Sequence, residues 1–154
     1  MLKKILSLIL CAIAVFALAS CGGNAADTEP PVTYLDPINC KVTVKISATA
    51  KKGEEILIDN LAITLRDKTE VPSALDALSQ ACYAYEIKYS ASEDGTTVGS
   101  VKNHSNFYSD SEGGTWFWEL TVNGKTPDGK AGEVEVKEGD VFVFTYSYIG
   151  GSAE

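Results

Sequence analysis

The order of its hydrophobic patterns constrains the fold of this chain more than any other feature. One stretch with helical spacing follows two extended stretches and precedes several more. In the first extended stretch, Lys41–Ala48, apolar and polar residues alternate strictly, which is typical of a strand with one buried face. The second, Glu54–Leu65, follows a turn at Lys51-Lys52-Gly53, and Asp59-Asn60 shift its apolar phase, which indicates a bulge or break.

The stretch with helical spacing should form one helix packed against the core. Thr69 is a candidate N-cap, and Pro72 suits the first turn. Four residues recur at the spacing of one helix face: Val71, Leu75, Leu78 and Cys82. Further strands are expected at Tyr85–Ser90, Thr97–Val101, Trp116–Val122, Glu133–Val136 and Val141–Ile149, with a tight turn at Asn123-Gly124. This order predicts an α+β fold, a single β-grasp-like domain in which a mixed sheet of about five strands carries one helix across it.

The first residues have the organisation of an export signal. A basic start, Met1–Lys4, precedes an apolar run over Ile5–Ala19 that is shorter than the ~20 residues of a membrane-spanning helix. The ending Leu18-Ala19-Ser20-Cys21 resembles the bacterial lipobox. That resemblance implies cleavage before Cys21, a diacylglycerol on its thiol, and localisation at the extracytoplasmic face of the cell membrane. An uncleaved anchor or a buried apolar segment is the alternative.

Cleavage at this point would divide the chain into a signal peptide (1–20), a lipidated tether (21–37) and a domain (38–154). The tether contains Asp27-Thr28-Glu29-Pro30-Pro31 and has little to bury, and its prolines favour an extended form. The whole chain has a formal net charge of −8. Because an acidic surface repels nucleic acid and anionic lipid, we expect neither as a partner, apart from the membrane reached through the lipid anchor.

Two cysteines fall within the expected domain, Cys40 on a strand and Cys82 on the helix. A period of 2 on the strand and of 3.6 on the helix points both side chains toward the core. Disulfides persist in the environment that an exported protein meets. A disulfide between Cys40 and Cys82 is therefore permitted, and two buried free thiols are the alternative.

Sequence motifs of enzyme chemistry are missing. His104 is the single histidine, with no cysteine near it, whereas a zinc site needs a cluster of ligands. The serines lack a Gly-x-Ser-x-Gly elbow, and Asp110-Ser111-Glu112-Gly113 lacks the remaining ligands of a calcium loop. We therefore expect a protein that is not an enzyme and has no resident cofactor or metal.

Aromatic residues give the positive signal for a binding site. Trp116 and Trp118 would share one face of a strand, opposite the aromatic residues of the last strand, and most of these side chains should fill the core. Two further aromatics, Phe107 and Tyr108, stand in a long polar loop. Aromatics in a polar loop beside an aromatic strand can form a flat platform for a ligand.

The second half of the chain also resembles a known family. The residues that carry the resemblance are Trp118, Asn123-Gly124, Thr126-Pro127, Gly132, Val136 and Gly139-Asp140, which precede an aromatic strand. They are similar to the C-terminal β-domain of transcobalamin and intrinsic factor, and more closely to its bacterial relatives on exported and lipid-anchored proteins. The resemblance covers about Lys41 to Tyr148. It implies a β-grasp domain that binds a soluble ligand, with cobalamin or another corrinoid as the leading candidate.

The resemblance also implies where this ligand would lie. Aromatic rings of Phe107, Tyr108, Trp116 and Trp118 would cover its flat face, and Asn123 would hydrogen-bond an amide side chain. His104 is the one imidazole that could reach a cobalt. In the vitamin carriers a large helical domain covers the other face of the corrinoid, and this sequence carries no counterpart, so the expected affinity is modest.

Two functional classes remain open at this point. The first is a lipid-anchored binding protein that captures a soluble ligand and passes it to a membrane importer. The second is a structural or adhesive surface module that binds a protein or cell-wall glycan. Exposed aromatics around Phe107, Tyr108 and Trp116 would favour the first, and full burial of the tryptophans would favour the second.

Overall fold

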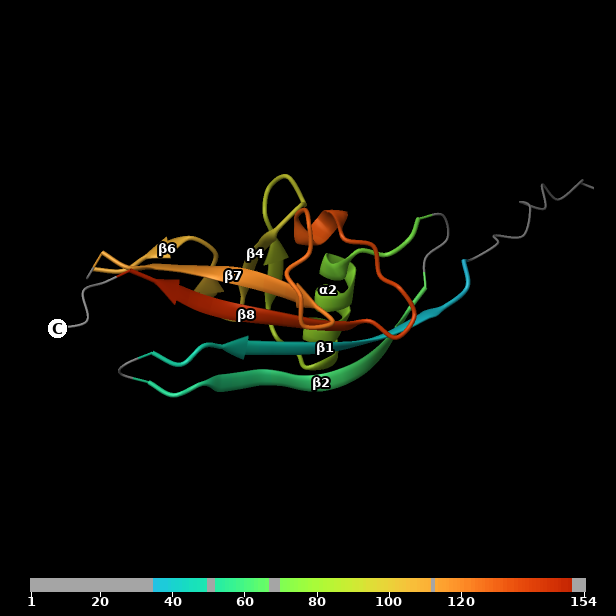
Figure 1. The fold of residues 1–154 in the computed structure, drawn as a ribbon, viewed down its shortest axis with the longest axis horizontal. Coiled ribbons are helices and arrows are strands. Elements are labelled where there is room, and N and C mark those ends of the chain that lie inside the picture. Colours follow the sequence, from blue (N-terminus) through green and yellow to red (C-terminus); the bar gives the residue numbers. More distant parts are fainter. Residues whose placement is uncertain (1–34, 50–51, 67–69, 112, 151–154) are drawn as a thin grey trace, which may run out of the picture. The chain divides into compact units, whose positions relative to one another are not determined.

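Two β-sheets and one α-helix make up the fold in the computed structural model, which describes residues 35–49, 52–66, 70–111 and 113–150 (Figure 1). The larger sheet has five strands in the order β2-β1-β8-β7-β6. Its members are β1 (Ile38–Ile46), β2 (Glu55–Leu65), β6 (Tyr108–Ser109), β7 (Thr115–Val122) and β8 (Val141–Ile149). The smaller sheet contains β3 (Tyr89–Ala91), β4 (Val98–Val101) and β5 (His104–Ser105). The predicted α+β class, a mixed five-stranded sheet with one helix, is confirmed.

The helix α2 (Ala74–Ala84) packs against β1, β2 and β3, and also against the short 3-10 helix η1 (Ala131–Glu133). The larger sheet is mixed because β1 pairs in parallel with β8. The other three pairs, β1 with β2, β7 with β8 and β6 with β7, are antiparallel. The described residues belong to one compact unit of the chain, Thr33–Glu154. The expected signal peptide, Cys21 and most of the tether lie outside the described residues.

The core follows the predicted alternation along the central strands. On β1 the buried residues are Cys40, Val42, Val44 and Ile46, and on β8 they are Phe142, Phe144 and Tyr146. The parallel register places these two sets side by side. Apolar residues of α2, including Leu75, Leu78 and Cys82, are buried as well. The bulge predicted at Asp59-Asn60 in β2 is also confirmed, because these two residues lie opposite a single residue of β1, Thr43.

The helix begins later than the sequence pattern predicted. Ser73 is the N-cap: its hydroxyl accepts from the Asp76 N–H, and its own N–H donates to the Asp76 carboxylate at 2.7 Å. This capping box satisfies donors of the first turn, so the helix starts at Ala74. Val71 precedes the helix and is 47% exposed, and Thr69 lies outside the described residues.

Two predicted strands are also corrected. Tyr85 to Lys88 lie in the turn after α2, where Glu86 has a φ of 55° and Ile87 N–H donates to Cys82 O, so only Tyr89–Ala91 forms a strand. Glu133–Val136 is not a strand, because η1 ends there and Glu135 forms an isolated bridge with Ser73. The tight turn at Asn123-Gly124 forms as expected, with φ of 52° and 77°.

Cys40 and Cys82 are both buried and are free thiols in the structure. Burial raises the pKa of each thiol from 9.0 to about 11, and at Cys40 the nearby Asp140 and Glu138 add to the effect. The two periodicities therefore placed both side chains correctly in the core. The disulfide itself is absent from the structure and stays a prediction for the oxidised protein. In the described part of the chain, no helix is long and apolar enough to span a membrane.

Candidate functional site

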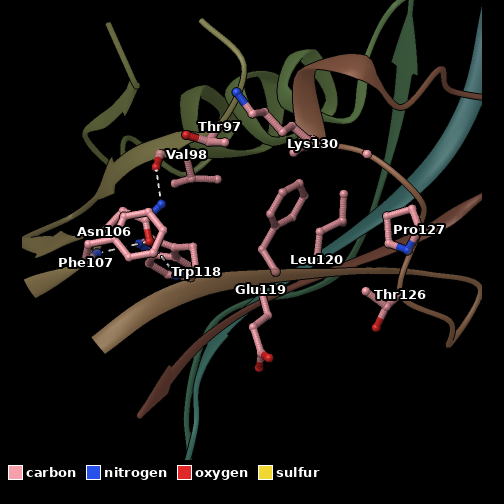
Figure 2. A pocket seen from close by; sticks show the side chains of 13 residues that line it. Thr97, Val98, Asn106, Phe107, Trp118, Glu119, Leu120, Thr126, Pro127 and Lys130 are labelled. Atoms are coloured by element: carbon pink, nitrogen blue, oxygen red, sulfur yellow. Dashed lines mark hydrogen bonds between the residues drawn. The ribbon is translucent and has the colours of Figure 1, made fainter. Parts of the chain in front are cut away.

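A pocket of about 180 Å³ lies along β7 (Figure 2). Its floor is formed by Trp118 and Leu120 of β7 together with Phe144 of β8, and Leu120 lies directly opposite Phe144 in the antiparallel register. Glu119 points away from the pocket, on the other side of the strand (Figure 2), and it accepts a hydrogen bond from the Ser147 hydroxyl there. Alternation along β7 therefore gives the pocket an apolar floor.

One wall of the pocket is held by Asn106, which bridges two strands. Its Oδ1 accepts from the backbone N–H of Trp118 at 2.9 Å, and its Nδ2 donates to the carbonyl of Val98 on β4 at 2.8 Å. The indole N–H of Trp118 donates to His104 O at 3.0 Å. These bonds fix Trp118, which is only 9% exposed, as a rigid part of the floor.

The opposite wall is the segment of residues 126–131, which is fastened to the loop between β3 and β4. Lys130 Nζ lies 3.2 Å from Asp94 Oδ2 and 3.1 Å from Thr96 Oγ1. Hydrogen bonds from Ser92 and Thr96, with Lys130, hold the pKa of the exposed Asp94 carboxyl well below its usual range. Gly132 completes the contact, because a Cβ there would lie 2.8 Å from Gly95 O. Both walls are therefore preformed.

A second feature lies where the large sheet extends beyond α2 (Figure 1). Tyr108, Trp116 and Tyr148 are aligned across β6, β7 and β8, and we call these three residues the aromatic row. The Trp116 and Tyr148 ring centroids are 4.9 Å apart, and Trp116 stacks on the buried Tyr146 at 5.1 Å. Tyr108 is 55% exposed and Trp116 is half-buried. The aromatic row is thus partly open to solvent, and it is separate from the residues that line the pocket.

The five predicted ligand-binding residues fall into three places. Phe107 and Trp118 line the pocket, and Tyr108 and Trp116 belong to the aromatic row. Asn123 is engaged within the fold: its Nδ2 donates to Asp140 Oδ1 at 2.8 Å and its Oδ1 accepts from Val141 N–H at 2.9 Å. Through these two bonds Asn123 holds the start of β8.

His104 packs inward rather than toward the pocket. Its ring lies 5.0 Å from that of Tyr146, and burial lowers its pKa. Within the described residues there is no group of three or more His, Cys, Asp or Glu side chains that could hold a metal ion.

Sequence reasoning missed several residues of the pocket. Leu120 was not singled out, although it forms part of the floor. Asn106 and Lys130 gave no signal, because a polar residue in a loop is typical of any turn. Pro127 was part of the resemblance motif, and the Asn123-Gly124 turn next to it was the clearest pointer to this wall.

The second half of the chain matches one protein family. Residues 72–148 match the family described as Domain of unknown function (DUF4430), and since this is half of the chain, the chain belongs to that family. No curated protein matches the sequence.

Two solved structures are similar to the chain. One is haptocorrin in complex with Cbi, at 14% identity and a TM-score of 0.50, over 77% of this chain and 26% of haptocorrin. The other is described as a "putative metal binding protein" from Ruminococcus gnavus, at 18% identity and a TM-score of 0.43, over 73% of this chain and 99% of that one. At these identities the likeness to haptocorrin shows the fold alone, and this chain spans about a quarter of haptocorrin's length. A fold shared with haptocorrin agrees with the predicted transcobalamin-like domain.

Proposed function

We propose that this DUF4430 protein is a lipid-anchored binding protein without enzymatic activity, at the extracytoplasmic face of the cell membrane. It captures a soluble small-molecule ligand and delivers it to a membrane importer. The observation that carries the proposal is the preformed pocket beside β7, where the two aromatics Phe107 and Trp118 meet an apolar floor. The shared fold with haptocorrin, which binds a small corrinoid, supports ligand binding by this domain.

The size of the pocket limits how the ligand binds. A volume of about 180 Å³ is below the range of roughly 300–1,000 Å³ that encloses a drug-sized molecule. One part of a larger ligand would enter the pocket, and the rest would lie over Phe107, which is 72% exposed. A corrinoid, with a flat body and projecting arms, fits this description and is the first ligand to test.

Calorimetric titration of the mature protein with cobinamide and cobalamin tests the proposal, with tryptophan fluorescence as a second readout. We expect saturable binding with modest affinity and a change in Trp118 emission. Phe107→Ala should weaken binding about tenfold, because it removes an exposed aromatic contact at the pocket. Tyr83→Ala is the matched control, since Tyr83 is an aromatic that is 81% exposed on α2. If the titration gives no heat and no tryptophan quenching at millimolar ligand, the corrinoid is ruled out as the ligand.

Tyr108 and Trp116 were expected to cover a small ligand, but the aromatic row lies outside the pocket, and this position favours a second function, the binding of cell-wall glycan. The aromatic row is partly exposed on the sheet beyond α2, and aromatic faces of this kind can pack against sugar rings. Sedimentation with insoluble peptidoglycan separates the two functions. Loss of sedimentation in Tyr108→Ala but not in Phe107→Ala would assign glycan binding to the aromatic row, and no sedimentation of the wild type would reject it.

A further inference from the structure

The outer edge of β7 is covered by β6 only at its beginning. β6 pairs with Thr115 and Trp116, and among the described strands the remainder of β7 has a partner on its β8 side only. In an antiparallel pair, the backbone groups of successive residues point alternately toward the partner and away from it. The N–H of Asn123 donates to Val141 O at 2.8 Å, so residues 117, 119, 121 and 123 point toward β8.

The even-numbered residues of β7 must therefore direct their N–H and C=O groups outward. Two of them have partners on that side: Trp118 N–H donates to Asn106 Oδ1 at 2.9 Å, and Val122 N–H donates to Lys125 O at 2.8 Å. Leu120 lies between them. Among the residues that the structure describes, none forms a hydrogen bond with the N–H or C=O of Leu120. The pocket lies along this stretch and is lined by Leu120 itself.

We propose that the backbone N–H and C=O of Leu120 bind a primary carboxamide group of the ligand. The amide oxygen accepts from the Leu120 N–H, and the amide NH₂ donates to the Leu120 carbonyl. This inference rests on the proposed function, since it names the chemical group that the same pocket recognises.

The chemistry of the edge favours an amide over other groups. A carboxamide carries one acceptor and a donor side by side, which matches a donor and an acceptor on one residue. A carboxylate has no donor for the carbonyl, and an ammonium group has no acceptor for the N–H. Lys130 would attract a carboxylate, but its ammonium group is already paired with Asp94. The pocket lining also contains the apolar side chains of Val98, Pro127 and Phe144.

The fold already places a carboxamide oxygen on the preceding outward N–H group of β7. The Asn106 Oδ1 accepts from the Trp118 N–H, while its Nδ2 donates to the Val98 carbonyl on β4, so a carboxamide there partners the outward N–H at position 118. Position 120 presents the same kind of edge without a side chain to close it. A ligand amide would extend this pattern by one pair of residues.

Nuclear magnetic resonance of the ¹⁵N-labelled mature protein tests the inference with small probes. Butyramide is titrated in parallel with butyrate, butylammonium and N,N-dimethylbutyramide, which lacks the donor. We expect the Leu120 amide resonance to shift saturably with butyramide, and each of the other probes to bind about tenfold more weakly, as the loss of one or two hydrogen bonds predicts. Equal affinities for butyramide and butyrate, or a Leu120 resonance that does not move, would overturn the proposal.

Hydrogen exchange and one pair of variants provide independent readouts. The Leu120 N–H should exchange much faster than those of Glu119 and Thr121, and butyramide should slow it. Leu120→Pro removes the N–H at a position where the fold makes no use of it, while Leu120→Val keeps the N–H and changes the side chain. Loss of butyramide binding in the proline variant alone supports the proposal, and unchanged binding refutes it. If the proline variant does not fold, the probe titration decides.

The corrinoid titration separates this inference from the proposed function. If cobinamide binds without moving the Leu120 resonance, the function stands and the carboxamide site is wrong. If butyramide shifts Leu120 but neither corrinoid binds, the carboxamide site stands and the ligand is another amide.

Discussion

Replacement of Asn106 by alanine should destabilise the domain far more than a loop substitution normally does. The Asn106 amide accepts from the N–H groups of Trp118 and Phe107 and donates to the Val98 carbonyl, at 2.9, 3.1 and 2.8 Å. Alanine would leave the part-buried Trp118 N–H and Val98 carbonyl without this partner. Each such group costs about 1–3 kcal/mol, so we expect the free energy of unfolding to fall by roughly 2–4 kcal/mol.

Urea denaturation followed by tryptophan fluorescence measures this loss directly. The matched control is Asn103→Ala, because Asn103 is exposed in the neighbouring turn between β4 and β5 and no described residue forms a hydrogen bond with its side chain. That variant should stay within about 0.5 kcal/mol of the wild type. Asn106→Asp adds a test of the donor, since its carboxylate cannot donate to Val98 O until it is protonated below about pH 4. An Asn106→Ala loss equal to that of Asn103→Ala would refute the bridging role.

The four cysteines supply the remaining predictions. Cys21→Ser should abolish incorporation of labelled fatty acid and leave unprocessed precursor, whereas Cys11→Ser should label normally; label in the Cys21→Ser protein would disprove the lipid anchor. A Cys40–Cys82 disulfide should appear as two unalkylated cysteines in mass spectrometry of unreduced protein, and it would stabilise the fold by ~2–4 kcal/mol. In the reduced protein both thiols have their pKa raised from 9.0 to about 11. Over this pH range the folded protein keeps the two thiol protons while the unfolded chain loses them. The free energy of unfolding should therefore fall as the pH rises from 9.0 to about 11. The fall should be smaller in the Cys40→Ala/Cys82→Ala variant. Equal pH profiles for the two proteins would contradict this assignment.

The sequence pattern predicted those parts of the fold that depend on local spacing. The alternation of β1, the bulge of β2 and the Asn123-Gly124 turn were all correct, because each follows from neighbouring residues. The start of α2 was wrong because Ser73 with Asp76 competes with Thr69 as a cap, and local spacing cannot rank two possible caps. The strand predicted to begin at Tyr85 does not form there, because Glu86 adopts a positive φ that cannot be predicted from its residue type.

The candidate site could be predicted only in part for a related reason. Phe107 and Trp118 were found because aromatics in a loop and on a strand stand out by residue type. The backbone of Leu120 could not be found in this way, since its availability depends on where β6 stops pairing with β7. That point is set by contacts between distant segments, such as the bridge from Asn106 to Trp118. An open strand edge is a property of the register, and residue types do not encode it locally.

Phe107 connects the geometry of the edge with the proposed function. Its φ of 54° lies in the left-handed region, which costs a residue with a side chain roughly 1–2 kcal/mol. Phe107 is 72% exposed, so little burial offsets that cost. The same backbone turn separates the Asn106 contact with Trp118 from the pairing of Tyr108 with Trp116, and Phe107 itself lines the same pocket as Leu120. The strained backbone opposes folding and the exposed ring does little to offset it, and under the proposed function contact with a ligand would account for both. Replacing Phe107 therefore tests binding without removing anything on which the core depends.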